Sequence, residues 1–451
     1  MSAEFNDFIQ HVLEQHKTIN SIPKHYYNEY NVKRGLRNAD GTGVLAGLTA
    51  VGEVHGYVLD EGSKAPIVGT LRYRGYSVDD IIRNCKEHNR YGFEETVFLL
   101  LFGFLPTEEQ LNDFSQRLAS RRFLPENFAE DMILKAPSNN IMNKLARSVL
   151  ALYSYDKSDP DDISMDALFR QSLELIAMFP TLIAYAYAAK RHYYDGKSLV
   201  LHNPNPSLSI AENFLYMIRP NHKYSKIEAE ILDMALILHA EHGGGNNSAF
   251  TVRVLSSSNT DTYSTIAAAI GSLKGPRHGG ANQKTLAQMA EIENAVKDWS
   301  SEKEIYDYLC KIVRKEAGDG SGLIYGIGHA IYTISDPRAV ILKECAKNLA
   351  KELGREEEFN LYELVEKTAP KVFEDIKGIT APMPANVDFY SGLIYQMLKL
   401  PEELYTPIFA MARIVGWCAH RIEEVLTGGK IIRPAYKSII KRTEYLSIKE
   451  R

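Results

Sequence analysis

The chain has 451 residues, of which 45% are hydrophobic and 24% charged, a composition typical of a soluble protein with room for a large core and two domains. Its formal net charge of -5 and its pI of about 6.3 exclude a broad basic surface, so we expect no nucleic-acid partner and no binding to membranes. The four cysteines are far apart and form no C-x-x-C pair, which argues against a zinc ribbon or a disulfide framework and favours a reducing compartment.

The N-terminal residues favour a cytoplasmic location. They are mildly acidic and resemble neither a signal peptide nor a transit peptide. The most apolar stretch, 176–189, is too short to span a bilayer and is broken by Pro180. We therefore expect this stretch to be a helix of the core.

The elements in chain order predict a mainly helical protein with one small β-hairpin near the N-terminus. Residues 54–76 contain two β-type runs around a turn at 60–64. Residues 107–110 form a helix capping box, and helical spacing of apolar residues recurs from there to the C-terminus. After His278 the helices become rich in Lys and Glu, over about 291–366, which indicates a smaller domain inserted into a larger one.

Two histidines, His239 and His242, precede a glycine run at 243–245. They are three positions apart, so a helix that ends here places them on one face. A zinc site would need a third and a fourth ligand, and no second histidine pair or cysteine cluster supplies them. Since a cationic histidine suits a helix C-terminus, helix capping and the binding of an anionic ligand both remain open.

His278 lies in the stretch Gly-Pro-Arg-His-Gly-Gly-Ala-Asn, which follows an apolar helical run at 266–273. Gly275 and Pro276 must end that helix, because proline cannot extend it. We expect His278 on a loop whose glycines let a ligand approach the backbone. A structural histidine is the common alternative to a reactive one at such a place.

His329 and Arg338 flank a predicted helix start. Ser335 or Asp336 can cap a helix with Pro337 in its first turn, so that Arg338 and the backbone N–H groups could together hold a carboxylate. An isolated arginine here is commonly solvated instead. The glycines at 318–328 do not indicate a dinucleotide site, because a helix and not a strand precedes them.

Asp388 falls near the start of an apolar helix at 393–398, where it suits either an N-cap or a general base. Burial beside Phe389 and Tyr390 would raise its basicity, whereas the helix dipole would lower it. The sequence leaves this balance open.

Three arginines near the C-terminus have different expected roles. Arg413 is surrounded by apolar residues, so it implies either an internal salt bridge or an anionic ligand. Arg433, directly before Pro434, is a second candidate for an anion. Arg421 lies on the more charged side of its helix and is expected to be structural.

Taken together, these motifs resemble the citrate synthase family over nearly the whole chain. The motifs that carry the resemblance are Leu-Arg-Tyr-Arg-Gly-Tyr at 71–76, Ala-Glu-Asn-Phe-Leu at 211–215, His-Ala-Glu-His at 239–242, the His278 stretch, Gly-His-x-x-Tyr with its Asp-Pro-Arg at 328–338, and Pro-x-Asn-Val-Asp-Phe-Tyr-Ser-Gly at 384–392. The resemblance implies that the catalytic residues are His278, His329 and Asp388. It implies that oxaloacetate is bound by His242, Arg338, Arg413 and Arg433.

The resemblance also implies a two-domain helical fold and a homodimer. We expect residues 1–279 and 391–451 to form the large domain and residues 280–390 to form a small domain that closes over the site. In the family, the position of Arg433 reaches the active site of the partner. The implied activity is the acyltransferase reaction of the tricarboxylic acid cycle, in which acetyl-CoA and oxaloacetate are substrates and no cofactor or metal takes part.

Each implied catalytic residue has a chemical task in this reaction. Asp388 would remove a proton from the acetyl methyl group. His278, as a neutral imidazole, would donate its N–H to the enol oxygen, and His329 would polarise the oxaloacetate carbonyl. Domain closure would exclude water while the carbon–carbon bond forms, and opening would admit it for hydrolysis of citryl-CoA.

Two departures from the family pattern affect the expected CoA contacts. The chain has Tyr-Thr-Ile at 332–334, including Thr333, where many members have a basic residue, and its 380–385 segment replaces a common lysine and aromatic pair. Possible substitutes for the phosphate contacts are Lys274, Arg277 and Lys377, although each is more typical of a solvated surface charge.

The sequence leaves three alternative functions open. A 2-methylcitrate synthase would condense propionyl-CoA with the same acceptor, and the motifs do not separate it from citrate synthase. A metal-dependent helical hydrolase would use His239, His242 and His278 as ligands. A noncatalytic protein with the same fold would bind oxaloacetate without releasing CoA.

Overall fold

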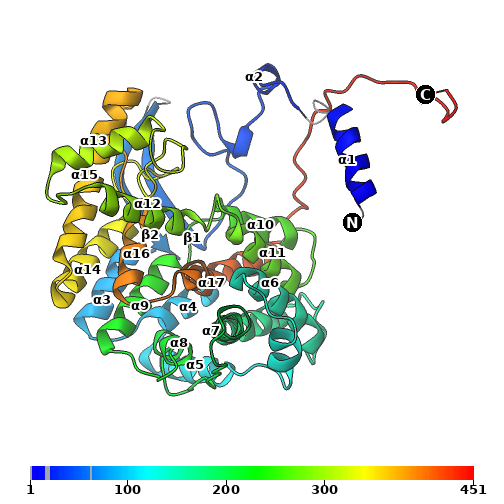
Figure 1. Cartoon of the computed structure of the whole chain (residues 1–451). Coiled ribbons are helices and arrows are strands. Elements are labelled where there is room, and N and C mark those ends of the chain that lie inside the picture. The colour runs from blue at the N-terminus through cyan, green and yellow to red at the C-terminus, as the bar shows by residue number, and fades with distance from the viewer. Residues whose placement is uncertain (1–2, 16–20, 61–62, 451) are drawn as a thin grey trace. The chain divides into compact units, whose positions relative to one another are not determined.

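The structure is a computed structural model that describes residues 3–15, 21–60 and 63–450. The chain forms two compact units, Met1–Gly47 with Leu59–Ala65, and Leu48–Val58 with Pro66–Arg451. The first unit contains α1 (Ala3–Gln15) and α2 (His25–Glu29), drawn in blue in Figure 1.

The second unit is mainly helical, as predicted (Figure 1). Its helices are α3 (Val78–Glu87), α4 (Phe93–Phe102), α5 (Glu108–Ser120), α6 (Ile141–Leu152), α7 (Met165–Asp195), α8 (Ile210–Ile218), α9 (Lys226–His239), α10 (Asn247–Ser256), α11 (Thr262–Lys274), α12 (Ala281–Ala295), α13 (Glu302–Val313), α14 (Pro337–Leu353), α15 (Glu356–Lys377), α16 (Val387–Met397) and α17 (Tyr405–Leu426). Shorter helical turns lie at Ala129–Leu134, Tyr153–Tyr155 and Glu402–Leu404.

The predicted hairpin is confirmed and is extended by a short third strand. Strands β1 (Gly52–Asp60), β2 (Ser63–Tyr73) and β3 (Tyr76–Ser77) form a sheet in the order β1-β2-β3. β3 runs antiparallel to β2, with Arg72 opposite Ser77. Of the expected turn, residues 61 and 62 lie outside the described part of the chain.

Local sequence signals explain where helices begin, but one expected break is wrong. The capping box of α5 is present, since the Thr107 hydroxyl accepts from Gln110 N at 3.2 Å and the Gln110 side chain accepts from Thr107 N at 2.9 Å. By contrast, α7 runs without interruption through Pro180. Proline removes one backbone hydrogen bond, but burial of most of the surrounding side chains keeps the helix continuous.

The length of α7 is sufficient to cross a membrane, and its surroundings explain why it is apolar. Among the described residues it is the one helix that is long and apolar enough, and 83% of its apolar window is buried inside the protein. It packs against α6, α8 and α17. The expectation of a core helix is therefore confirmed, although the helix is longer than the apolar stretch suggested.

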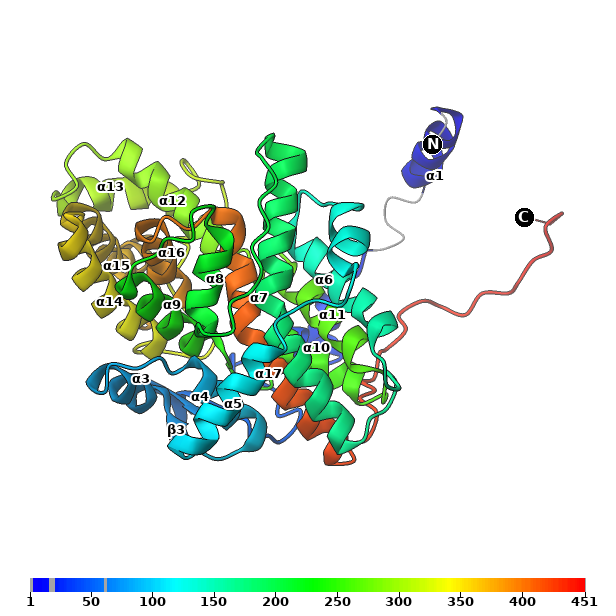
Figure 2. The ribbon, with the colours of Figure 1, turned by 90° about the horizontal axis from the view of Figure 1, so that it is seen from below.

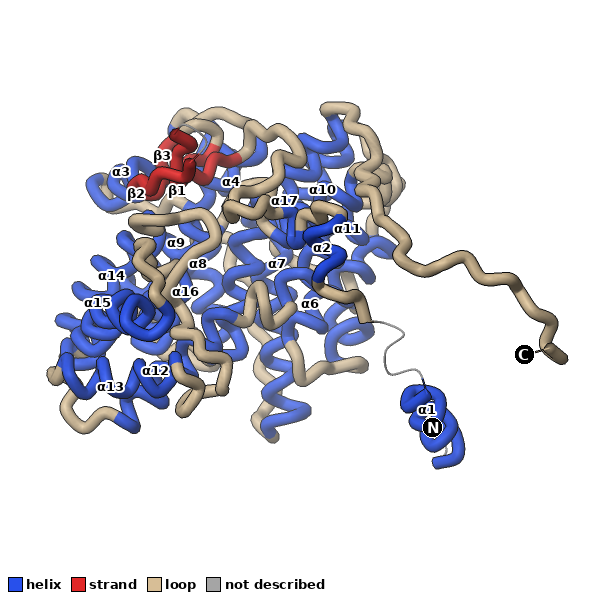
Figure 3. The backbone as a smooth tube through the Cα atoms, turned by 90° about the horizontal axis from the view of Figure 1, so that it is seen from above, coloured by secondary structure: helices blue, strands red, loops and turns tan. Residues whose placement is uncertain are grey.

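Within the second unit, α12, α13, α14, α15 and α16 lie together, away from α6, α10 and α11 (Figures 2 and 3). α14 packs on α16, and α13 packs on α15. α17 packs mainly on α7, α9, α10 and α11, with a smaller contact to α12. The predicted limit between the small domain and the C-terminal part, at residue 390, falls inside the continuous helix α16.

Two glycines of the hairpin bring its backbone against the segment between His329 and Arg338. A Cβ on Gly69 would lie 2.1 Å from the Ser335 carbonyl oxygen, and one on Gly56 would lie 2.6 Å from the Tyr332 Cα. Thr333 also donates its hydroxyl to the Gly56 carbonyl. Only glycine permits this approach, so the hairpin fixes a segment that carries two site residues.

Candidate active site

A cavity of about 150 Å³ brings together six residues that the sequence singled out. They come from widely separated positions and line the cavity together: His242, His278, His329, Arg338, Asp388 and Arg413. Of these, Arg413 lies on α17, Arg338 on α14 and Asp388 on α16. The three histidines come from the connections that follow α9, α11 and α13.

The segment that carries His242 differs from the prediction. α9 ends at His239, so the two histidines do not share a helix face. The reason lies in α17, where Arg413 Nε donates to the His239 carbonyl at 2.6 Å and Gly416 N donates to the Ala240 carbonyl at 3.2 Å. Because α17 takes these two carbonyls, the chain leaves the helix and carries His242 into the cavity, whereas His239 contacts the Tyr395 hydroxyl.

Arg413 is fully buried, and its two terminal nitrogens, Nη1 and Nη2, have no hydrogen-bond partner among the described residues. Burial lowers the pKa of this guanidinium to about 10, and Glu241 opposes that shift. Burying an unpaired cation is unfavourable, so the arrangement indicates a site for an anion. His242 adds a second buried atom of this kind, since its Nε2 also lacks a partner there.

Arg338 is buried at the N-terminus of α14, and not solvated. Its Nε and Nη2 lie 3.0 and 2.8 Å from the two carboxylate oxygens of Asp336, which also caps the helix. Burial alone would lower the pKa of Arg338, but Asp336 raises it above its usual range. The carboxylate therefore holds the arginine in one orientation and keeps it charged.

His329 has a defined tautomer. Its Nδ1 accepts hydrogen bonds from Ile331 N at 3.1 Å and from Tyr332 N at 3.0 Å. An imidazole nitrogen that accepts cannot carry a proton, so the proton is on Nε2. His329 therefore offers an N–H donor from its other ring nitrogen.

His278 lies on a loop after α11, as predicted, and the glycine beside it has a packing role. A Cβ on Gly279 would lie 2.2 Å from the Leu273 carbonyl oxygen, so this glycine lets the loop fold against its own backbone. His278 Nε2 contacts the Ser248 hydroxyl at 3.1 Å. Burial, reinforced by Arg413, lowers the pKa of His278 to about 4, so the ring is neutral near pH 7.

Asp388 is not the cap of α16. The Asn386 side chain caps this helix and accepts from Asp388 N at 3.0 Å, which leaves the Asp388 carboxylate in the cavity. Burial raises its pKa to about 6, although Arg338 and Arg413 act in the opposite direction. The balance that the sequence left open therefore favours desolvation.

The other predicted residues lie elsewhere. Arg433 is exposed in the segment after α17 and does not line the cavity, and the same holds for Lys274 and Arg277 at the end of α11 and after it. Lys377 donates to the Gly322 carbonyl at 2.7 Å. Arg421 is buried and bonded to Thr262, Ser256, Thr265 and Thr260, which agrees with a structural role.

Several cavity residues were not assigned a role from the sequence. Asn246 and Asn386 are two of them, and each caps a helix and lines the cavity. An asparagine directly before a helical run was the available signal. Tyr395, Tyr405 and Phe409 lie in apolar helical stretches and gave no signal, since only the packing turns them towards the cavity.

The described residues contain no group of three His, Cys, Asp or Glu side chains that could hold a metal ion. His239, one of the three ligands of the metal-dependent alternative, does not line the cavity.

A family model described as citrate synthase, C-terminal domain, matches residues 40–435. The chain belongs to the citrate synthase family. Citrate synthase 2 of Bacillus subtilis is 36% identical over 391 residues, which cover 86% of this chain and 95% of that protein. The 2-methylcitrate synthase 1 of Corynebacterium glutamicum is 33% identical over 435 residues, which cover 94% of this chain and all of that protein (100%).

The citrate synthase fold is found in solved structures as well. Citrate synthase from Thermoplasma acidophilum, in a ternary complex with carboxymethyl coenzyme A and oxaloacetate, matches with a TM-score of 0.74 and 27% identity, covering 93% of this chain and 99% of that one. Citrate synthase from Pyrobaculum aerophilum matches with a TM-score of 0.72 and 29% identity, covering 90% and 94%. The chain is thus an enzyme of the citrate synthase family with the fold that the sequence predicted.

The raised pKa of Asp388 predicts a pH-dependent effect on stability. A carboxyl whose pKa rises on folding stabilises the protein below its unfolded pKa, near 4, and loses that contribution as the pH rises through about 6. Asp388→Asn removes the titration. Urea unfolding should show the variant more stable than the wild type by up to about 3 kcal/mol at pH 7.5, with little difference at pH 4. A pH-independent difference would contradict the raised pKa.

Proposed function

We propose that this chain condenses acetyl-CoA with oxaloacetate and water to give citrate and CoA. The observation that carries the proposal is the cavity itself, in which a buried guanidinium whose terminal nitrogens have no partner among the described residues lies with neutral imidazoles and a carboxylate of raised pKa. A dianionic acceptor would supply the missing partners, and the carboxylate would supply the base.

Oxaloacetate is bound by positive and donor groups that line the cavity. Arg413 and Arg338 receive its carboxylates, and His242 donates to it. A third arginine, Arg433, reaches the site of the partner subunit in a homodimer, which accounts for its exposed position in a single chain.

Enol formation requires a base and a hydrogen-bond donor at once. Asp388 takes the proton from the acetyl methyl group, a task that suits a carboxyl with a pKa near 6. In this step neutral His278 carries its ring proton on Nδ1 and donates it in a hydrogen bond to the enol oxygen. Because the pKa of His278 for accepting a second proton is lowered to about 4, the ring stays neutral, and its N–H stabilises the developing negative charge on the enol oxygen by a hydrogen bond.

The enol carbon then attacks the oxaloacetate carbonyl carbon, which His329 polarises through its Nε2–H. The alkoxide formed on the former keto oxygen takes the Nε2 proton of His329, which yields citryl-CoA, and the proton held by Asp388 restores His329 through solvent before the next turnover. Water subsequently attacks the thioester carbonyl, and CoA leaves as the thiol together with citrate.

Closure of the small domain, residues 280–390, over residues 1–279 and 391–451 separates these two stages. His329, Arg338 and Asp388 belong to the small part by this division, and His242, His278 and Arg413 to the large one. Because α16 is continuous across residue 390, it would move as one rigid helix with the small part.

Lys274 and Arg277, which are exposed, are the better candidates for binding the CoA phosphates, since Lys377 donates to the Gly322 carbonyl. The cytoplasm remains the proposed location.

A 2-methylcitrate synthase activity is the second candidate. It is supported by the relative of that name, which matches 94% of this chain at 33% identity. Propionyl-CoA adds one methyl group that would have to fit beside Asp388.

The direct test measures CoA thiol release with oxaloacetate and either acetyl-CoA or propionyl-CoA. We expect a larger kcat/KM with acetyl-CoA, because the cavity of about 150 Å³ leaves little room beside its aromatic lining. A larger kcat/KM with propionyl-CoA would favour the second candidate. No release with either thioester would contradict both enzymatic assignments.

Asp388→Asn tests the base directly. The amide cannot accept the methyl proton, so turnover should fall at least about a hundredfold, whereas the affinity for oxaloacetate, measured by calorimetry without acetyl-CoA, should stay within about threefold. Normal turnover of the variant would remove Asp388 from this role.

A further inference from the structure

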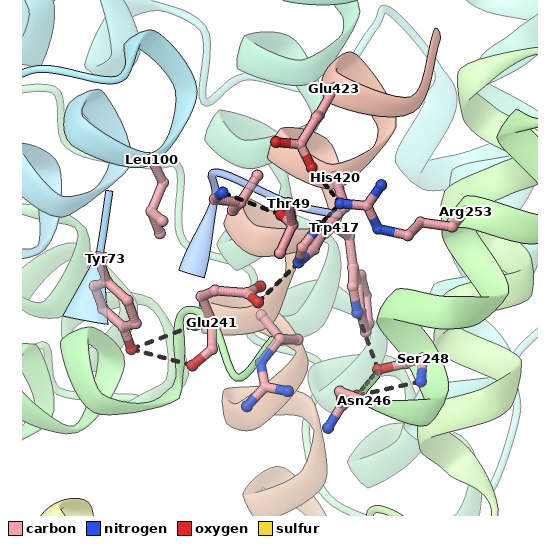
Figure 4. Close-up of polar contacts among 12 residues, drawn as sticks. Thr49, Tyr73, Leu100, Glu241, Asn246, Ser248, Arg253, Trp417, His420 and Glu423 are labelled. Carbon is pink, nitrogen blue, oxygen red and sulfur yellow. Dashed lines mark hydrogen bonds and ion pairs between the residues drawn. The ribbon is translucent and has the colours of Figure 1, made fainter. Parts of the chain in front are cut away.

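We propose that a buried network of side chains, the Glu241 relay, fixes the positions of His242 and Asn246 relative to Arg413. The relay is therefore a positioning network. The relay consists of Glu241, His420, Arg253 and Glu423 (Figure 4). It rests on the proposed oxaloacetate site, and it gives a role to buried charges that the chemistry itself does not use.

The hydrogen bonds of the relay have one consistent direction. Arg253 Nη2 can only donate, and it lies 2.7 Å from His420 Nδ1, so this nitrogen accepts. The ring proton is therefore on Nε2, which donates to Glu241 Oε1 at 2.8 Å. His420 and Glu241 are both fully buried, and His420 lowers the pKa of Glu241 even though burial raises it.

The far end of the relay is anchored outside the cavity. Arg253 is paired with both Glu423 and Glu424 near the end of α17. Glu423 in turn accepts from Ala50 N at 2.7 Å. Hydrogen bonds and ion pairs thus tie Glu241 to α10, α17 and the segment before β1 (Figure 4).

At the near end, the relay fixes the segment between His239 and His242 from several sides. The Tyr73 hydroxyl lies 3.3 Å from the Glu241 carbonyl oxygen and 3.4 Å from Glu241 N. Glycines make room for the carboxylate, because a Cβ on Gly416 would lie 2.2 Å from Glu241 Oε2 and one on Gly52 would lie 2.8 Å from Glu241 Cγ. Glu241 therefore has one possible placement.

The glycine run after His242 packs on the same relay. A Cβ on Gly244 would lie 2.9 Å from Arg253 Nε and 3.5 Å from the His420 ring. This contact determines the path of the chain from His242 to Asn246, and both residues line the cavity. Since Arg413 and His420 lie on the same helix, the relay ties the loop to the arginine that faces it.

The test is Glu241→Gln, which keeps the shape of the side chain and removes its charge. We expect the KM and the dissociation constant for oxaloacetate to rise by about tenfold to a hundredfold, because a small displacement of binding groups has effects of that size. The KM for acetyl-CoA should change by less than about twofold. Partial unfolding would behave differently, since it lowers the apparent kcat and leaves both KM values unchanged.

Asp156→Asn is the matched control. Asp156 is another buried carboxylate, bound by Arg170 at 2.9 and 3.0 Å, and it does not line the cavity. This variant should lose stability without a change in either KM. If Glu241→Gln fails to fold, His420→Gln, whose amide cannot bridge Glu241 and Arg253 as the rigid ring does, should show the same selective rise in the oxaloacetate KM.

An unchanged or lower oxaloacetate KM and dissociation constant in a folded Glu241→Gln or His420→Gln protein would overturn the inference. Inactivity of the wild type would instead contradict the proposed function. In that case the calorimetric affinity for oxaloacetate alone decides the role of the relay.

Discussion

The structure depends on one unfavourable placement, a fully buried arginine whose terminal nitrogens have no partner in the described chain. A buried cation without a counter-ion costs several kcal/mol, and burial already lowers the pKa of Arg413 to about 10. Such a placement persists only where the surrounding fold determines it. α17 supplies that constraint, since Arg413 Nε is tied to the His239 carbonyl.

The other charges of the site are arranged around this cation. Arg338 has its own carboxylate, Asp336, so its orientation is settled before any ligand arrives. Burial and Arg413 hold the pKa values of His242 and His278 below the usual range, and Arg338 adds to the shift at His242, so both rings stay neutral. Burial also raises the pKa of Asp388 to about 6, which makes it a better base than an ordinary aspartate. The proposed site for a dianion and the proposed site for proton abstraction therefore depend on the same desolvation.

The sequence predicted those features that local rules determine. The capping box at Thr107, the hairpin, the loop of His278 and the helix start before Arg338 each follow from a short pattern, and all are present. The set of cavity residues came from the family resemblance and not from spacing. Its convergence on one cavity required the packing of helices that are far apart in the sequence.

The remaining features depend on tertiary contacts that no local pattern encodes. Pro180 was expected to break a helix, but the packing around α7 outweighs one lost hydrogen bond. His239 and His242 were expected on one face, but α17 takes the carbonyls at the end of α9. The Glu241 relay joins residues more than 160 positions apart, so neither its members nor the tautomer of His420 could be inferred from the sequence.

The central claim is that the terminal nitrogens of Arg413 have no partner among the described residues because the proposed dianion is their partner. The most direct measurement is the rise in stability that oxaloacetate produces in the wild type and in Arg413→Leu. A ligand at about a hundred times its dissociation constant stabilises the folded protein by about 2.7 kcal/mol. We predict this increase for the wild type and almost none for the variant at the same concentration, although the variant without ligand should unfold at a similar or higher urea concentration. An equal stabilisation of both proteins by oxaloacetate would contradict the account.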